Sequence, residues 1–118
     1  TRKKMDQSFG GLQARRALKT AISILDSASD TPEEIYTHIY KAVICFINHK
    51  IGSKKVEYST GEITEVIKNY DKAGMYKEIE QILTRGEAVR FAPISSQDAQ
   101  KDLLEIKELL EKIDGSWS

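Results

Sequence analysis

The amino-acid sequence predicts an all-α protein, a compact bundle of about five helices with a helix-turn-helix-like pair in its second half. Apolar residues recur at helical spacing in five segments that are otherwise polar. Residue types that begin and end helices flank these segments, and no credible run of strand residues interrupts them. The 118 residues suit one domain that can bury most of its apolar side chains.

The chain begins with a polar and basic lead, residues 1–11, that ends in Gly10 and Gly11 and has little to bury. We expect this lead to be flexible. Residues 12–27 then form a helix with one apolar face, made by Ala14, Leu18, Ala21, Ile22 and Leu25. On its other side, Arg15, Arg16 and Lys19 lie near the N-terminal end, where positive charge opposes the helix dipole. This cationic cluster is either a solvated face or has a use beyond folding.

The next helix has the strongest start signal in the chain and runs from residue 31 to about residue 50. Thr31 is the expected N-cap, Pro32 the first helical residue and Glu34 the third. Its apolar stripe consists of Ile35, Ile39, Val43, Phe46 and Ile47. Because this is the most apolar helix, we expect it at the centre of the bundle, with Gly52 as a stop signal.

Residues 51–58 are expected to form a loop, with a brief extended piece at residues 56–58. A pair of short helices follows. Ser59 and Glu62 have capping-box spacing at the start of the first one. Its stripe consists of Ile63, Val66, Ile67 and Tyr70, and the stripe of the second helix consists of Met75, Ile79, Ile82, Leu83 and Val89. Gly74 between them is the expected left-handed residue.

The end of this pair carries three informative residues. Gly86, late in the second helix, either allows another helix to approach closely or is a tolerated surface glycine. Pro93 forbids continuation of the helix. We expect Phe91, just before that break, to fold back over the core, since phenylalanine is usually buried.

Ser95 and Asp98 also have capping-box spacing and mark the start of the last helix, and Gly115 is expected to end it. Its buried face consists of Ala99, Leu103, Ile106, Leu110 and Ile113, with Leu104 and Leu109 at the margins. The predicted organisation is therefore a basic lead at residues 1–11, a single helical domain at residues 12–114 and a tail at residues 115–118.

Charge is balanced over the whole chain but unevenly placed along it. The formal net charge is zero, so there is no global signal for nucleic acid. Residues 1–20 carry six basic residues against one acidic residue, which is +6 − 1 = +5. No apolar run approaches the roughly 20 residues that span a bilayer, and no signal peptide is visible. The single cysteine, Cys45, excludes an internal disulfide and weakly favours a reducing compartment.

The side chains best suited to bind a metal or act in catalysis are His38, Cys45 and His49, which fall on one face of the central helix. Cys45 and His49, four residues apart, could share a zinc ion, but no further Cys or His exists to complete a site. The alternative is a half-buried cysteine with two histidines at the rim. No phosphate-binding loop or nucleophile motif is present. We therefore expect no catalytic residues, no cofactor and no metal ion.

The helix pair also admits a helix-turn-helix interpretation, because the turn is about the right length and contains a glycine. A recognition helix offers basic and amide side chains to the DNA groove. The second helix offers a mixed set that includes carboxylates, Tyr76, Lys77, Glu78, Glu80, Gln81 and Arg85. A nucleic-acid-binding module is therefore the alternative function and not the leading one.

Two groups of residues about fifty positions apart resemble a known family. The first group is RRALKTA at 15–21, IY at 35–36, KAV at 41–43, FI at 46–47 and KI at 50–51. The second is TGEI at 60–63, IL at 82–83 and GEAVRFAP at 86–93. In this order and spacing, residues 15–113 resemble the C-terminal domain of BatD, the Bacteroides aerotolerance membrane protein. Gly86 departs from the pattern, since the family commonly has Cys or a similar small residue there. The family's first helix is also usually more densely basic.

The resemblance implies a large periplasmic β-rich part, one transmembrane helix and then this helical domain in the cytoplasm. The family is associated with oxygen tolerance and envelope stress, and no enzymatic activity is attached to it. Its members are encoded alongside von Willebrand A-type and tetratricopeptide proteins and a MoxR-type AAA+ ATPase. The basic residues near the N-terminus would then lie beside the inner membrane, where anionic headgroups attract them: Arg2, Lys3, Lys4, Arg15, Arg16 and Lys19.

The sequence thus favours a non-enzymatic, cytoplasmic protein-interaction domain of a membrane-anchored BatD-like protein. Its expected partners are other Bat-type proteins or the MoxR-type ATPase, together with the inner-membrane surface and without nucleic acid. The candidate partner surface combines the exposed side of residues 75–89 with the loop at residues 90–95. Its candidate residues are Tyr76, Lys77, Arg85, Arg90, Phe91 and Pro93.

Overall fold

The computed structural model describes residues 16–117, and these residues form an all-helical bundle of five helices, as predicted. The first helix is described over residues 16–26. It is followed by α2 (Pro32–Ile51), α3 (Thr60–Tyr70), α4 (Tyr76–Ala88) and α5 (Ser96–Ser116). The expected lead, residues 1–11, lies outside the described residues.

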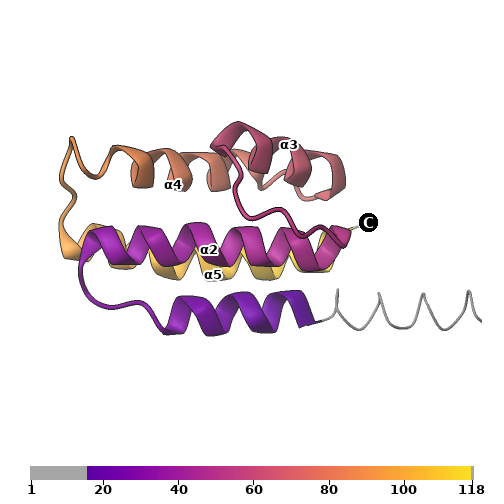
Figure 1. Cartoon of the computed structure of the whole chain (residues 1–118), viewed down its shortest axis with the longest axis horizontal. Helices are drawn as coiled ribbons and strands as arrows, with labels where there is room; N and C mark the ends of the chain where they lie inside the picture. The colour runs from indigo at the N-terminus through magenta and orange to yellow at the C-terminus, as the bar shows by residue number, and fades with distance from the viewer. Residues whose placement is uncertain (1–15, 118) are drawn as a thin grey trace, which may run out of the picture.

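The helices are arranged around a central pair, α2 and α5 (Figure 1). Helices α3 and α4 pack together on one side of this pair, and the first helix lies on the other side. The prediction that α2 is central is confirmed, because the side chains of Ile35, Ile39, Phe46 and Ile47 are almost fully buried. Burial of each such side chain stabilises the fold by about 1.5–3 kcal/mol.

At most predicted helix ends, the structure shows the capping hydrogen bonds or backbone angles that the sequence predicts. Ser59 Oγ accepts a hydrogen bond from the Glu62 backbone N–H at 3.1 Å, and Glu62 Oε1 accepts one from the Ser59 N–H at 2.9 Å. The capping box of α3 is therefore complete. Thr31 is the N-cap of α2, but its side chain makes no capping bond. Gly52 ends α2 with a left-handed φ of 71°.

Two local expectations are wrong. Phe91 does not cover the core, because 88% of it is exposed in the α4–α5 loop. Gly115 does not end the last helix, since α5 continues to Ser116. The loop expected between the second and third helices is confirmed, since residues 53–59 belong to neither a helix nor a strand.

The C-terminal residues close one end of the bundle. The Trp117 ring stacks on Tyr70 with 4.9 Å between centroids and meets the Phe46 ring edge-on at 5.7 Å. Asp71, at the end of α3, accepts hydrogen bonds from the Ala73 N–H at 2.9 Å and from Ser116 Oγ at 2.7 Å. A segment that the sequence presents as a tail is therefore joined to the turn between α3 and α4.

Candidate functional site

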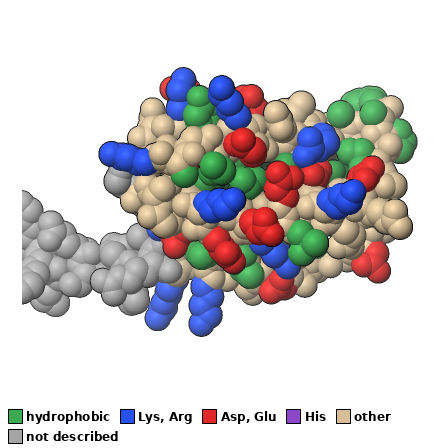
Figure 2. All heavy atoms as spheres, turned by 180° about the vertical axis from the view of Figure 1, so that it is seen from behind, with side chains coloured by type: hydrophobic (Ala, Val, Ile, Leu, Met, Phe, Trp, Pro, Cys, Tyr) green, Lys and Arg blue, Asp and Glu red, His purple; other side chains and the backbone are tan. Residues whose placement is uncertain are grey.

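The α4–α5 loop is the most prominent apolar protrusion of the predicted partner surface. Arg90, Phe91, Ala92 and Pro93 are all exposed, whereas Val89 just before them is buried. The Phe91 and Ala92 N–H groups both donate to the Ala88 carbonyl oxygen, at 2.9 and 2.8 Å, so the chain turns sharply as α4 ends. The loop lies at one end of the bundle in Figure 1, and hydrophobic side chains gather at that end in Figure 2.

Arg85, also expected on the partner surface, keeps 43% of its side chain exposed but forms an ion pair within the protein. Its Nε and Nη2 atoms donate to the two carboxylate oxygens of Asp102 at 2.9 and 2.7 Å. The Tyr36 hydroxyl donates to the same carboxylate at 2.5 Å. Burial, followed by the hydrogen bond to Asp102, raises the pKa of Tyr36 well above its usual range. This network joins α2, α4 and α5 and holds the C-terminal half of α4, from which the exposed loop projects.

The six predicted partner residues therefore do not form one patch. Tyr76 and Lys77 begin α4, whereas Arg90, Phe91 and Pro93 follow its end, about 20 Å away along a 13-residue helix. Tyr76 is partly buried, and the Lys68 ammonium lies 5.7 Å from the centre of its ring. Only the three loop residues lie together and are all freely exposed.

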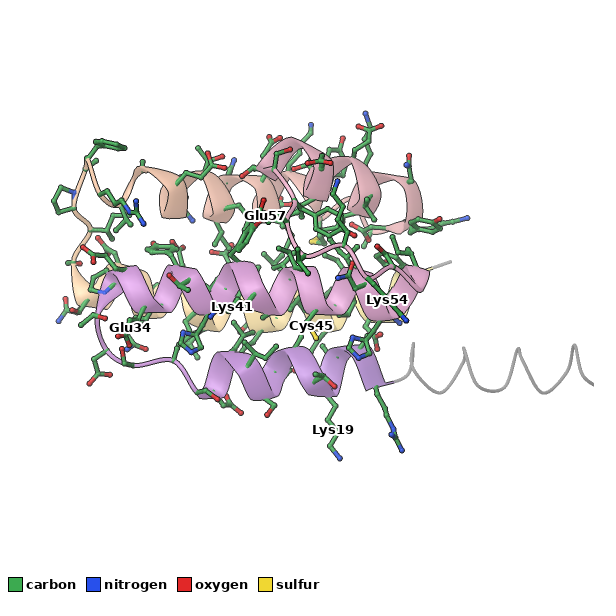
Figure 3. All side chains as sticks on the ribbon, in the orientation of Figure 1. Lys19, Glu34, Lys41, Cys45, Lys54 and Glu57 are labelled. Carbon is green, nitrogen blue, oxygen red and sulfur yellow. The ribbon has the colours of Figure 1, made fainter. Side chains whose placement is uncertain are left out.

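The predicted membrane-proximal cluster lies only partly within the described residues. Arg2, Lys3, Lys4 and Arg15 fall outside them. Arg16 and Lys19 are exposed on the first helix, and Figure 3 shows Lys19 pointing away from the other helices.

The Cys45 and His49 side chains contact each other, one turn apart on α2. His49 Nδ1 lies 3.4 Å from Cys45 Sγ and 2.8 Å from the Cys45 carbonyl oxygen. His38 Nδ1 lies 2.8 Å from the Glu34 carbonyl oxygen. Because a carbonyl oxygen only accepts, both Nδ1 atoms carry a proton and donate it. Burial raises the pKa of the Cys45 thiol, which disfavours the thiolate. Within residues 16–117, no three metal-binding side chains gather at one point.

Two grooves on α2 share Tyr40 in their lining. The first, which we call the acidic groove, has a volume of about 430 Å³ and runs between α2, α4 and the start of α3. Its charged residues are Glu33, Glu34, Glu87 and Arg90, and its apolar residues include Ile39, Ile82, Leu83 and Val89.

The second groove, which we call the basic groove, has a volume of about 690 Å³ and lies between α2 and the loop that follows it. Its charged residues are Lys41, Lys54, Lys55 and Glu57, with His49 beside them. Figure 3 shows Glu34 near the start of α2, Lys41 nearer its middle and Lys54 beyond its end.

A hydrogen-bonded network holds the loop that forms one wall of the basic groove. The Tyr40 hydroxyl accepts from the Tyr58 N–H at 3.0 Å and donates to the Tyr58 carbonyl oxygen at 2.7 Å. The Tyr58 hydroxyl donates to Asn48 Oδ1 at 2.7 Å, and Asn48 Nδ2 donates to the Lys55 carbonyl oxygen at 2.8 Å. The loop is thus tied to α2 at several points, so the wall of the groove is fixed.

Sequence reasoning missed Asp102 and both grooves. Asp102 did leave a signal, because it falls on the apolar stripe of α5, three residues after Ala99 and four before Ile106. A carboxylate at such a position needs a partner when the helix is buried. The grooves left no comparable signal, since each is assembled from helices and loops that are distant in sequence.

Comparison with known proteins identifies no matching family model, no matching curated protein and no matching solved structure. Over residues 16–117, no helix combines the length and the apolarity that a membrane crossing would require.

Proposed function

We propose that this chain is a non-enzymatic protein-interaction domain on the cytoplasmic side of the bacterial inner membrane. In this proposal it belongs to a membrane-anchored, BatD-like protein linked to oxygen tolerance and envelope stress. Its partners are Bat-type proteins of the von Willebrand A or tetratricopeptide type, or a MoxR-type AAA+ ATPase. The proposal rests on the resemblance of residues 15–113 to the C-terminal domain of BatD.

The observation that carries the docking role is the exposed Phe91. A phenylalanine that is 88% exposed costs solvation free energy without stabilising the fold. The neighbouring residues Arg90 and Pro93 are also exposed, so the loop offers an aromatic and a cationic group together. Aromatic residues and arginine are the side chains most enriched at the energetic centres of protein interfaces. The motif GEAVRFAP, which carries much of the family resemblance, ends in this same loop.

The proposed orientation toward the membrane rests on charge. Residues 1–20 carry a net charge of +5, and their described members Arg16 and Lys19 are exposed on one helix. A basic residue near an anionic membrane surface contributes about 1 kcal/mol of attraction. The first helix lies on the opposite side of the central pair from α4, so the Phe91 loop remains accessible when the first helix approaches a membrane (Figure 1).

The test is capture of a purified Bat-type von Willebrand A protein, a tetratricopeptide protein and a MoxR-type ATPase, with and without nucleotide, on the immobilised chain. We expect at least one partner to bind and the variant Phe91→Gln to weaken its binding about 30-fold, as loss of an interface aromatic does. Leu104→Gln is the matched control, because Leu104 is an apolar residue that is 60% exposed on α5, outside the loop. This control should bind as the unchanged chain does.

Two results would contradict the proposal. One is that none of these partners binds in any nucleotide state. The other is that both Gln variants bind every partner as well as the unchanged chain. Tight, salt-sensitive binding of duplex DNA would instead favour the nucleic-acid alternative.

A further inference from the structure

The two grooves beside Tyr40 carry opposite net charges. The acidic groove has three glutamates and one arginine, which is −3 + 1 = −2. The basic groove has three lysines and one glutamate, which is +3 − 1 = +2. Lys55 is paired with Glu62 beside the groove, so the excess positive charge lies on Lys41 and Lys54. Tyr40 lines both grooves, so the negatively and positively charged grooves lie next to each other on the surface.

The apolar parts of the two grooves are also complementary in shape. Val56, on the rim of the basic groove, is 83% exposed and projects from a loop that is tied to α2. The acidic groove has an apolar floor that includes Ile39 and Leu83. A protruding aliphatic side chain and an apolar hollow on the same molecule are complementary surfaces.

We propose that the occupant of these grooves is a second copy of this chain. The two copies are related by a two-fold axis that passes close to Tyr40. Each acidic groove then faces the basic groove of the other copy, and Val56 of each copy enters the acidic groove of the other. A two-fold interface requires a surface that is complementary to itself. Opposite charges in two grooves that share Tyr40 meet this requirement.

The charge balance favours a second copy over another partner. A partner of one charge sign would satisfy one groove and be repelled by the adjoining one, because like charges that face each other across an interface are unfavourable. A second copy satisfies both grooves at once. The network of Tyr40, Tyr58 and Asn48 already holds the loop in place, so dimer formation does not have to order it.

Sedimentation equilibrium of the whole chain, from micromolar to millimolar concentration, tests the proposal. We expect a monomer–dimer equilibrium that weakens as ionic strength rises from about 0.05 to about 0.5 M. The variant with Lys41→Glu and Lys54→Glu makes both grooves acidic. The variant with Glu33→Lys and Glu34→Lys makes both grooves basic. Each should dimerise at least about tenfold more weakly, because like charges now face each other.

The decisive measurement is an equimolar mixture of these two variants. In the mixture every groove again faces one of opposite charge, so we expect a heterodimer about as stable as the unchanged dimer. Circular dichroism should show both variants folded, since all four substituted side chains are exposed.

Three results would overturn the proposal. They are a chain that stays monomeric at the highest concentration, variants that dimerise as well as the unchanged chain, and a mixture that does not associate. If a monomeric chain bound polylysine or polyglutamate peptide, one groove would instead belong to a different, charged partner. Arg90 lines the acidic groove, but Phe91 lines neither groove, so the effect of Phe91→Gln on partner capture is measured independently of dimer formation.

Discussion

Replacement of Asp102 by Asn disturbs the junction of α2, α4 and α5 at one atom. Asp102 is only 6% exposed and accepts from both Tyr36 and Arg85. An amide of the same shape keeps one oxygen and presents an N–H₂ group where the second oxygen was. Oδ2 accepts from both the Tyr36 hydroxyl and Arg85 Nε, whereas Oδ1 accepts from Arg85 Nη2. The amide oxygen therefore takes the place of Oδ2, and the N–H₂ group faces Arg85 Nη2, donor against donor.

The expected loss of stability follows from the burial of each partner. The hydrogen bond from the buried Tyr36 hydroxyl remains but loses its charged acceptor, which costs about 1 kcal/mol. The Arg85 side chain is 43% exposed, so loss of its ion pair adds at most about 1 kcal/mol. The total of about 1–2 kcal/mol is a sizeable share of the roughly 5–15 kcal/mol that stabilises a typical domain. It corresponds to a fall in melting temperature of about 5 °C.

Urea titration of the folded chain measures this loss, with Glu105→Gln as the matched control. Glu105 is exposed on the same helix, so its replacement should change the free energy of unfolding by less than about 0.5 kcal/mol. A cycle that combines Asp102→Asn with Tyr36→Phe should show a coupling of at least about 0.5 kcal/mol. If Asp102→Asn were as mild as the control, the network would not hold the three helices and the reasoning would fail.

Two further predictions use matched or pH-dependent comparisons. Gly86→Ala should destabilise the chain, because the new Cβ would lie 3.1 Å from Cβ of the buried Tyr36, whereas Gly61→Ala, with no atom closer than 3.9 Å, should stabilise it by up to about 1 kcal/mol. Thermal melts decide this, and equal signs for the two variants would contradict it. The hydrogen-bonded salt bridge to Lys55 and the capping box lower the pKa of Glu62 to about 2, below its unfolded value of about 4.3. The stability that ionised Glu62 gives the folded chain is therefore complete above pH 4.3 and is lost as pH falls toward 2. Glu62→Gln should therefore flatten the fall of melting temperature across this window, and an unchanged slope would refute the assignment.

Much of the local structure could be predicted because its causes are close together in sequence. The capping box of Ser59 and Glu62, the stop at Gly52 and the apolar stripe of α2 each depend on residues within a few turns. The sequence left two interpretations of Gly86 open, a close approach by another helix and a tolerated surface glycine. The closeness of Tyr36 supports the first interpretation. No residue near Gly86 in the sequence identifies Tyr36 as that neighbour.

The position of Phe91 shows where this reasoning fails. Phenylalanine is buried on average, and that average predicted a side chain folded over the core. The core is closed instead at the opposite end of the bundle by Trp117, which contacts Phe46 and Tyr70. Which aromatic residue is buried depends on where the ends of the helices meet, and no local pattern specifies that.

For residues 16–117, the sequence by itself determined the number of helices, most of their boundaries and the centrality of α2, because periodicity and capping act over short distances along the chain. Only the tertiary structure decided that Arg85 binds Asp102, that Phe91 is exposed and that two oppositely charged grooves adjoin at Tyr40. Each of these features brings together residues from different helices or loops, so it depends on the angles and offsets at which the helices pack. Side-chain shape across the whole core sets those angles, and a pattern read along one helix does not contain them.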